Sequence, residues 1–148
     1  MPAYFPPETR QLLLKLKLFQ GLDEAELSEL MAEADLIEVP AGDYIIREGE
    51  QGHELFVLLA GDAKILKRSA GAQKIIQYLK PGDCFGEMSL IDCRSRSASV
   101  KASTICKLLR LDGDDLISRP PISFKIYRNI AILLSQKLRH ANEMLTLG

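Results

Sequence analysis

The residues best suited to chemistry in this sequence lie between Phe85 and Val100, in the segment FGEMSLIDCRSRSASV. The segment contains a glycine, Gly86, an acidic residue, Glu87, and an arginine, Arg96. A glycine turn exposes backbone N–H groups, a carboxylate accepts hydrogen bonds from hydroxyls, and a planar guanidinium binds phosphate through paired donors. A phosphate on a sugar requires these three groups, so the segment predicts a site for a small phosphorylated sugar.

The composition narrows the class of protein. A chain of 148 residues is long enough for one domain with its own core. The formal net charge is −1, so the sequence has no overall positive field that would attract nucleic acid. No apolar run reaches the roughly 18–20 residues of a membrane span, and the start, MPAYFPPETR, does not resemble a signal peptide. We therefore expect a cytoplasmic protein without a membrane partner.

Cysteine and histidine do not form a metal-binding pattern. The three cysteines, Cys84, Cys93 and Cys106, include no C-x-x-C pair, which favours free thiols in a reducing compartment. Neither His53 nor His140 lies at metal-ligand spacing from a cysteine or an acidic cluster. We expect no metal site and no cofactor. No Ser-His-Asp order or His/Asp cluster predicts hydrolysis, so the chain is not expected to be an enzyme.

Strands are predicted for the middle of the chain, because short apolar or alternating runs are separated there by turns that contain glycine or proline. The runs are Leu36–Val39, Tyr44–Ile46, Leu55–Leu59, Ala63–Leu66, Lys74–Leu79, Ser97–Lys101 and Cys106–Leu111. Strands of this length and spacing are typical of a β-sandwich or β-barrel.

Helices are predicted on both sides of the strands. One begins at Pro6-Pro7 and runs to about Phe19, and a second begins at Asp23, which has Glu26 at the spacing of a capping box. The last segment, about residues 122–147, repeats apolar residues at helical spacing. Such a helix is longer than a small barrel needs, so it covers a pocket, pairs with a second copy, or does both.

Four segments, taken in order, resemble the cyclic-nucleotide-binding domain family, which includes the catabolite activator protein, protein kinase A regulatory subunits and nucleotide-gated channels. They are IIREGEQG (45–52), LLAG (58–61), KPGDCFGE (80–87) and the segment from Phe85 to Val100. The resemblance implies an α+β, mainly β, fold: an eight-stranded jelly-roll β-barrel with N-terminal helices and a long C-terminal helix. Residues 18–148 would form the domain, with strands over about 36–111, after a helical extension, 1–17.

The resemblance implies which residues hold the phosphate and the ribose. Glu87 would accept a hydrogen bond from the ribose 2′-hydroxyl, and Arg96 would bind the cyclic phosphate with its planar fork. Backbone N–H groups and the Ser97 hydroxyl would add further donors. The residues assigned in this way are Gly86, Glu87, Met88, Ser89, Arg96, Ser97 and Ala98.

Four further residues are implied as contacts of the base. Ile46, Ile65 and Ile76 match positions that pack against it, and Asn142, in the final helix, could hydrogen-bond either purine. Ser97, directly after the arginine, also suits either base. The expected ligand is cAMP, with cGMP as the alternative.

Simpler structural explanations stay open for some of these residues. Glu87 and Arg96 could form an ion pair that only braces the turn. Arg94 could compete for the phosphate or assist in binding it, and serine stands at position 95 where many family members have proline. Four glycines are more simply turn residues that need a positive φ: Gly49, Gly52, Gly61 and Gly82.

Three functions fit the sequence. The first is a cyclic-nucleotide receptor that binds without turnover and signals through movement of its C-terminal helix, as a homodimer or with a protein partner. The second is the sensory domain of a transcription regulator or other effector; no helix-turn-helix follows the last helix here, so direct DNA binding is not expected. The third is a jelly-roll dimerisation scaffold that has lost its ligand.

Overall fold

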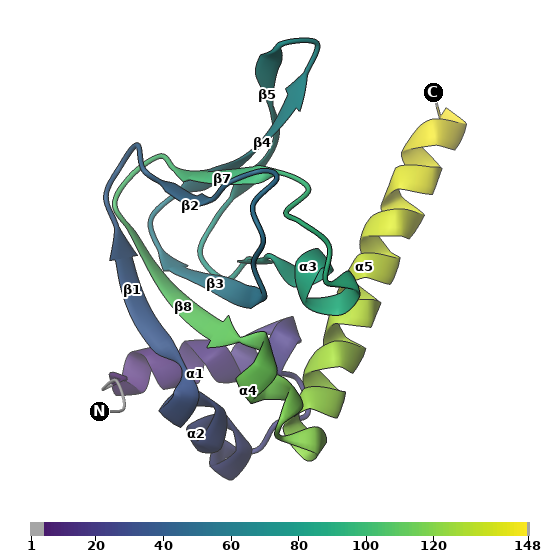
Figure 1. Cartoon of the computed structure of the whole chain (residues 1–148). Coiled ribbons are helices and arrows are strands. Elements are labelled where there is room, and N and C mark those ends of the chain that lie inside the picture. Colours follow the sequence, from purple (N-terminus) through teal and green to yellow (C-terminus); the bar gives the residue numbers. More distant parts are fainter. Residues whose placement is uncertain (1–4, 148) are drawn as a thin grey trace.

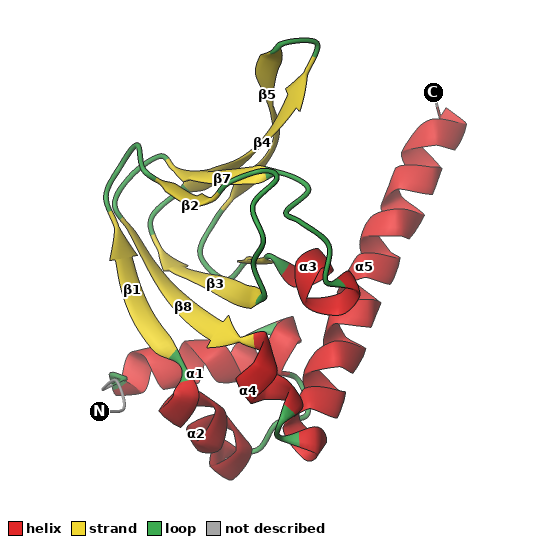
Figure 2. Ribbon diagram, in the orientation of Figure 1, coloured by secondary structure: helices red, strands yellow, loops and turns green. Residues whose placement is uncertain are grey.

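The structure is a computed structural model that describes residues 5–147. Over these residues, eight strands form two four-stranded antiparallel sheets, with the orders β1-β8-β3-β6 and β2-β7-β4-β5 (Figure 2). The strands are β1 (Asp35–Val39), β2 (Tyr44–Ile46), β3 (Glu54–Ala60), β4 (Ala63–Ser69), β5 (Ala72–Leu79), β6 (Cys84–Phe85), β7 (Ser99–Ala102) and β8 (Cys106–Asp112). The predicted eight-stranded jelly roll is confirmed.

Strand β3 separates two apolar layers. Leu55 and Val57 pack in the cluster beneath the helices, whereas Phe56 and Leu58 pack between the two sheets. Successive side chains of a strand point to opposite faces, so the unbroken apolar run of β3 suits a strand that is covered on both faces. The Phe56 ring stacks on that of Phe85 in β6, with centroids 5.3 Å apart.

Helices cover the outer face of the first sheet (Figure 1). They are α1 (Pro7–Lys15), the 3-10 helix η1 (Lys17–Phe19), α2 (Glu24–Glu33), α4 (Gly113–Ile117) and the first half of α5 (Pro120–Leu147), while α3 (Glu87–Asp92) follows β6. Leu13 of α1 and Ile126 of α5 are fully buried in the same apolar cluster as Leu55 of β3. Helix α1 therefore packs into the core that the strands also form.

The helix boundaries follow local signals. Asp23 and Glu26 form the predicted capping box, in which each side chain accepts from the other residue's backbone N–H, at 2.8 and 3.2 Å. Leu16 has extended backbone and divides the first predicted helix into α1 and η1. The final helix begins at Pro120 rather than near residue 122, because proline is well tolerated in a first helical turn.

The two halves of α5 have different surroundings. The first half is held by buried side chains, which are Ile122, Ile126, Asn129 and Ile130. The amide of Asn129 donates to the backbone carbonyls of Leu18 and Gln20, at 2.7 and 2.9 Å. From residue 131 to 145 no side chain is buried, and the helix projects past the body on the side of the β4–β5 hairpin (Figure 1). Within residues 5–147, no helix is both long and apolar enough to cross a membrane.

Candidate functional site

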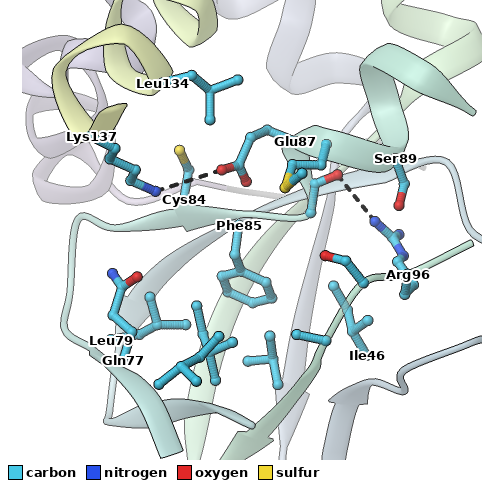
Figure 3. A pocket seen from close by; sticks show the side chains of 17 residues that line it. Ile46, Gln77, Leu79, Cys84, Phe85, Glu87, Ser89, Arg96, Leu134 and Lys137 are labelled. Carbon is cyan, nitrogen blue, oxygen red and sulfur yellow. Dashed lines mark hydrogen bonds and ion pairs between the residues drawn. The ribbon is translucent and has the colours of Figure 1, made fainter. Parts of the chain in front are cut away.

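A cavity of about 210 Å³ opens between the second sheet, α3 and α5 (Figure 3). It brings together most of the predicted site residues from strands β2, β4 and β5 and from the segment around α3. Those that line it are Ile46, Ile65, Ile76, Gly86, Glu87, Met88, Ser89, Arg96, Ser97 and Ala98. Asn142 is exposed on α5 and does not line this cavity.

The Arg96 side chain is buried in the wall of the cavity, with only 6% of the residue exposed. Its Nη1 donates to the carbonyl of Gly86 at 3.1 Å, and its Nη2 donates to the carbonyl and carboxylate of Glu54 at 3.1 and 3.0 Å. Burial lowers the pKa of Arg96, while the charges of Glu54 and Glu87 oppose that shift. An arginine stays protonated in proteins, so the cavity has a fixed positive group at this end.

The backbone of Arg96 is also held in place. Its carbonyl accepts from the N–H of Gly49 at 2.9 Å, and its own N–H donates to the carbonyl of Glu50 at 2.8 Å. These bonds tie the segment that precedes β7 to the loop between β2 and β3. The guanidinium is thus positioned from both its backbone and its side chain.

Two glycines make room for this arginine. A Cβ on Gly86 would lie 2.8 Å from the carbonyl oxygen of Glu54 and 2.9 Å from Nη1 of Arg96, and Gly86 also has φ +86°. A Cβ on Gly52 would lie 2.7 Å from Nε of Arg96. The predicted positive φ holds at Gly49 and two other glycines, 61 and 82, but not at Gly52. Gly52 instead provides space for the guanidinium.

Glu87 stands in the first turn of α3 and carries the second charge of the cavity. Its side chain is 12% exposed, and Oε1 lies 3.6 Å from Nζ of Lys137 on α5, whose side chain is 55% exposed. Glu87 and Arg96 do not pair with each other, since the partner of Arg96 is Glu54. The ion pair that would only brace the turn is therefore absent from the described residues.

The rest of the cavity wall is mainly apolar. Leu134 of α5 faces the cavity across from the strand residues, and the almost fully buried Phe85 forms part of the wall (Figure 3). Gln77 and Lys137 are polar groups at the end away from Arg96 (Figure 3). The arrangement suits a compact anion that has a hydroxyl beside Glu87 and an apolar, planar part between strands and helix.

Cys84 of β6 lines this cavity. Burial raises the pKa of its thiol to about 11, and the negative charge of Glu87 adds to the shift. A thiol that keeps its proton is a poor nucleophile. Among residues 5–147, no group of three His, Cys, Asp or Glu side chains could hold a metal ion.

The residues of the site that the sequence did not assign to it include Glu54, Gln77, Leu134 and Lys137. Lys137 follows Leu134 by three positions, so both lie on the side of the helix that Ile130 occupies. The helical repeat could have placed this lysine on the cavity side. The pairing of Glu54 with Arg96 joins residues 42 positions apart and has no local signal.

The fold and the cavity define a jelly roll with a pocket that has a buried guanidinium in its wall, and comparison with known proteins identifies its family. The model of the cyclic nucleotide-binding domain family matches residues 36–118, more than half of the chain. The chain belongs to the cyclic nucleotide-binding domain family.

Relatives include bacterial regulators and eukaryotic kinase subunits. A CRP-like cAMP-activated global transcriptional regulator of Mycobacterium tuberculosis is 29% identical over 140 residues, which are 91% of this chain and 61% of that protein. A cAMP-dependent protein kinase regulatory subunit of Emericella nidulans is 35% identical over 102 residues, which are 69% of this chain and 24% of that protein. The crystal structure of the Thermus thermophilus catabolite activator protein matches with a TM-score of 0.80 and 31% identity, covering 88% of this chain and 62% of that one. The chain spans less than two thirds of the length of each.

Proposed function

We propose that this chain is a cytoplasmic receptor domain for a cyclic purine nucleotide, with cAMP as the expected ligand and cGMP as the alternative. The observation that supports the proposal most strongly is the buried, hydrogen-bonded guanidinium of Arg96 in the cavity wall. A buried guanidinium is costly to desolvate, yet this one is held by two carbonyls and one carboxylate at the wall of a cavity. A site that keeps such a group fixed before a ligand arrives is suited to binding an anion.

In the proposed complex, the ligand lies along the cavity from Arg96 towards α5. The cyclic phosphate accepts from Arg96, backbone N–H groups at Gly86 and Ala98 add donors, and the ribose 2′-hydroxyl donates to Glu87. The base packs on Ile46, Ile65 and Ile76. We propose binding without turnover, because the chemistry of the lining residues is that of recognition by hydrogen bonds and packing.

The proposed signal is a population shift of α5. The second half of this helix has no buried side chain between residues 131 and 145, so little packing opposes its movement. A ligand under Leu134 would favour a closed position of the helix and could bring Asn142 towards the base. Exposed apolar residues of the same half would then be presented to a second copy of the chain or to a protein partner.

A second candidate is the sensory part of a longer effector. Its support is the length comparison, because the Mycobacterium tuberculosis transcriptional regulator extends well beyond the region that matches this chain. In that case the same ligand event would be passed by α5 to an output domain. The 148 residues themselves are not expected to bind DNA.

Thermal unfolding with a panel of nucleotides tests the proposal. A ligand at 100 times its Kd adds about 2.7 kcal/mol to the free energy of unfolding, so cAMP should raise the melting temperature clearly. Non-cyclic 5′-AMP is the control for general nucleotide binding, and cGMP tests the choice of base. If no cyclic nucleotide shifted the melting temperature, the receptor proposal would fail and a ligand-free scaffold would be favoured.

A further inference from the structure

Beyond Ile130, α5 contacts the cavity through only two of its described side chains, Leu134 and Lys137. Leu134 contributes an apolar surface. Lys137 contributes a charge, with its Nζ 3.6 Å from Oε1 of Glu87. This ion pair is the polar connection between the projecting half of the helix and the residue that is proposed to bind the ribose.

Both members of the pair also line a second cavity of about 470 Å³, which is bounded by η1, the turn before β6 and α5. Four residues line both cavities: Gln77, Cys84, Glu87 and Lys137. The position of Lys137 therefore decides how closed the nucleotide cavity is on the side of α5.

A bound nucleotide would increase the need of the Glu87 carboxylate for a nearby cation. Glu87 is already mostly buried, and a nucleotide lying over it would remove its remaining contact with water. An ionised carboxylate without a cation or sufficient donors is costly in such a place. The phosphate would add a second negative charge nearby, while Arg96 on that side is engaged by Glu54. Asp83 and three further lysines, Lys15, Lys17 and Lys80, also line the second cavity, but among the described residues the cation that pairs with Glu87 is Lys137.

We propose that Lys137 is the counter-ion of Glu87 in the occupied site, and that through this pair the bound nucleotide fixes the second half of α5. The inference rests on the proposed function of the cavity. Lys137 is then a positioning residue with two effects. It offsets the charge of Glu87 while the carboxylate accepts from the ribose hydroxyl, and it makes the helix position depend on occupancy.

An alternative in which Lys137 competes with the ligand for Glu87 predicts a different effect on affinity. If Lys137 were a latch that the ribose hydroxyl must displace, its removal would strengthen binding. Because the counter-ion gains importance when the ligand excludes water, removal should instead weaken binding. The sign of the change in Kd separates the two.

The test uses Lys137→Met, which keeps much of the aliphatic length and removes the charge, and Lys137→Arg, which keeps the charge. Lys107→Met is the matched control, because Lys107 is exposed on β8 and does not line the cavity. Calorimetry would give the Kd of each protein for cAMP and for 2′-deoxy-cAMP. We expect Lys137→Met to raise the Kd for cAMP about twofold to fivefold, as for loss of a partly exposed ion pair.

The deoxy ligand gives a readout that a purely structural role would not move. In Lys137→Met it would leave Glu87 covered with neither a cation nor a hydroxyl, so its Kd should rise at least about twofold more than that of cAMP. Lys137→Arg and Lys107→Met should both keep the wild-type ratio of the two dissociation constants.

Hydrogen exchange tests the connection to the helix. With cAMP at saturation, the wild type should slow exchange both in residues 86–98 and in residues 134–145, whereas Lys137→Met should keep only the first effect. Unchanged affinity, tighter cAMP binding or retained helix protection in Lys137→Met would each overturn the inference while leaving the receptor function standing. If the wild type bound no cyclic nucleotide, the proposed function would fail and this inference with it.

Discussion

The two ends of the cavity are built differently. At one end, Arg96 is buried, its guanidinium makes three hydrogen bonds, and its backbone is paired with the loop before β3. At the other end, Lys137 is more than half exposed and makes one ion pair, at 3.6 Å. The first end is held by the second sheet and the loop before β3, while the second depends on the position of a helix.

The difference follows from the elements that carry the two residues. Arg96 precedes β7, which pairs with both β2 and β4 in the second sheet. Lys137 belongs to the half of α5 from which buried side chains are absent between residues 131 and 145. A rigid end gives a ligand its binding energy without reorganisation, and an adaptable end can report that the ligand has bound. The predictions below test this division.

Removal of the rigid cation should have the largest effect. Arg96→Ala should weaken cAMP binding by about 30-fold to several thousand-fold, because truncating a buried charged partner costs about 2–5 kcal/mol. Calorimetry measures the change, and circular dichroism should show that the variant is folded. Arg96→Lys keeps the charge without the planar fork, so its affinity for cAMP should lie between those of the wild type and Arg96→Ala. Equal affinity in all three would remove Arg96 from the site.

Displacing the same guanidinium without deleting it should have the next largest effect. Gly52→Ala would place a Cβ 2.7 Å from Nε of Arg96, so the arginine must move, and we expect the Kd for cAMP to rise about tenfold. The control is Gly71→Ala, in the turn between β4 and β5, where φ is +81° and no atom lies within 4 Å of the new Cβ. That change should lower stability and leave the affinity unaltered. A Gly52→Ala protein that binds normally would show that the rigid end is less constrained than its geometry indicates.

The carboxylate that holds Arg96 should matter more to stability than to affinity. Glu54→Gln removes the counter-ion of a buried guanidinium that keeps its two carbonyl partners, so the free energy of unfolding should fall by about 1 kcal/mol. The bound phosphate would take over this role, so saturating cAMP should reduce the difference from the wild type. The Kd should accordingly be equal to or below that of the wild type. Urea unfolding with and without cAMP measures both effects, and a strongly raised Kd would contradict the division of roles.

The smallest effect concerns the thiol near the adaptable end. The pKa of Cys84 is raised from 9.0 to about 11 by burial, so at about pH 8 it should react with Ellman's reagent far more slowly than the exposed Cys93. Since Cys84 lines the cavity, cAMP should slow its reaction further. The double variant Cys93→Ser, Cys106→Ser leaves Cys84 as the only thiol of the chain, so its reaction is measured alone. Rapid modification of Cys84 that ignores the ligand would place the nucleotide elsewhere.

The raised pKa of Cys84 also makes the free energy of unfolding depend on pH. As the pH rises from 9 towards 11, the unfolded chain loses the Cys84 proton before the folded chain does. The contribution of this residue to stability is therefore present below about pH 9 and falls over that interval. The difference in stability between the wild type and Cys84→Ala should shrink accordingly.

The sequence predicts the rigid end well because most of it is local. Gly86, Glu87 and Arg96 come from one segment with a recognisable order, and turn residues between apolar runs indicate the strands. Strand β6, with two residues, is too short for a periodic pattern to reveal.

The parts that the sequence does not predict depend on contacts between distant positions. Glu54 meets Arg96 across 42 residues, and Gly52 provides space for a side chain rather than an unusual turn. Lys137 meets Glu87 only because α5 crosses the cavity. Helical spacing indicates a covering face but not the point along the helix at which packing stops, so it does not single out Lys137. The assignment of Asn142 to the base comes from the family resemblance and stays a prediction.

A calorimetric titration of the wild-type chain with cAMP tests the central claim most directly. If Arg96 and Glu87 form a nucleotide site, the titration should show saturable binding of one cAMP per chain, and 5′-AMP at the same concentrations should compete poorly. No saturable heat up to about 1 mM cAMP or cGMP, a weak-binding limit of about −4 kcal/mol, would contradict the claim that this cavity is a cyclic-nucleotide receptor site.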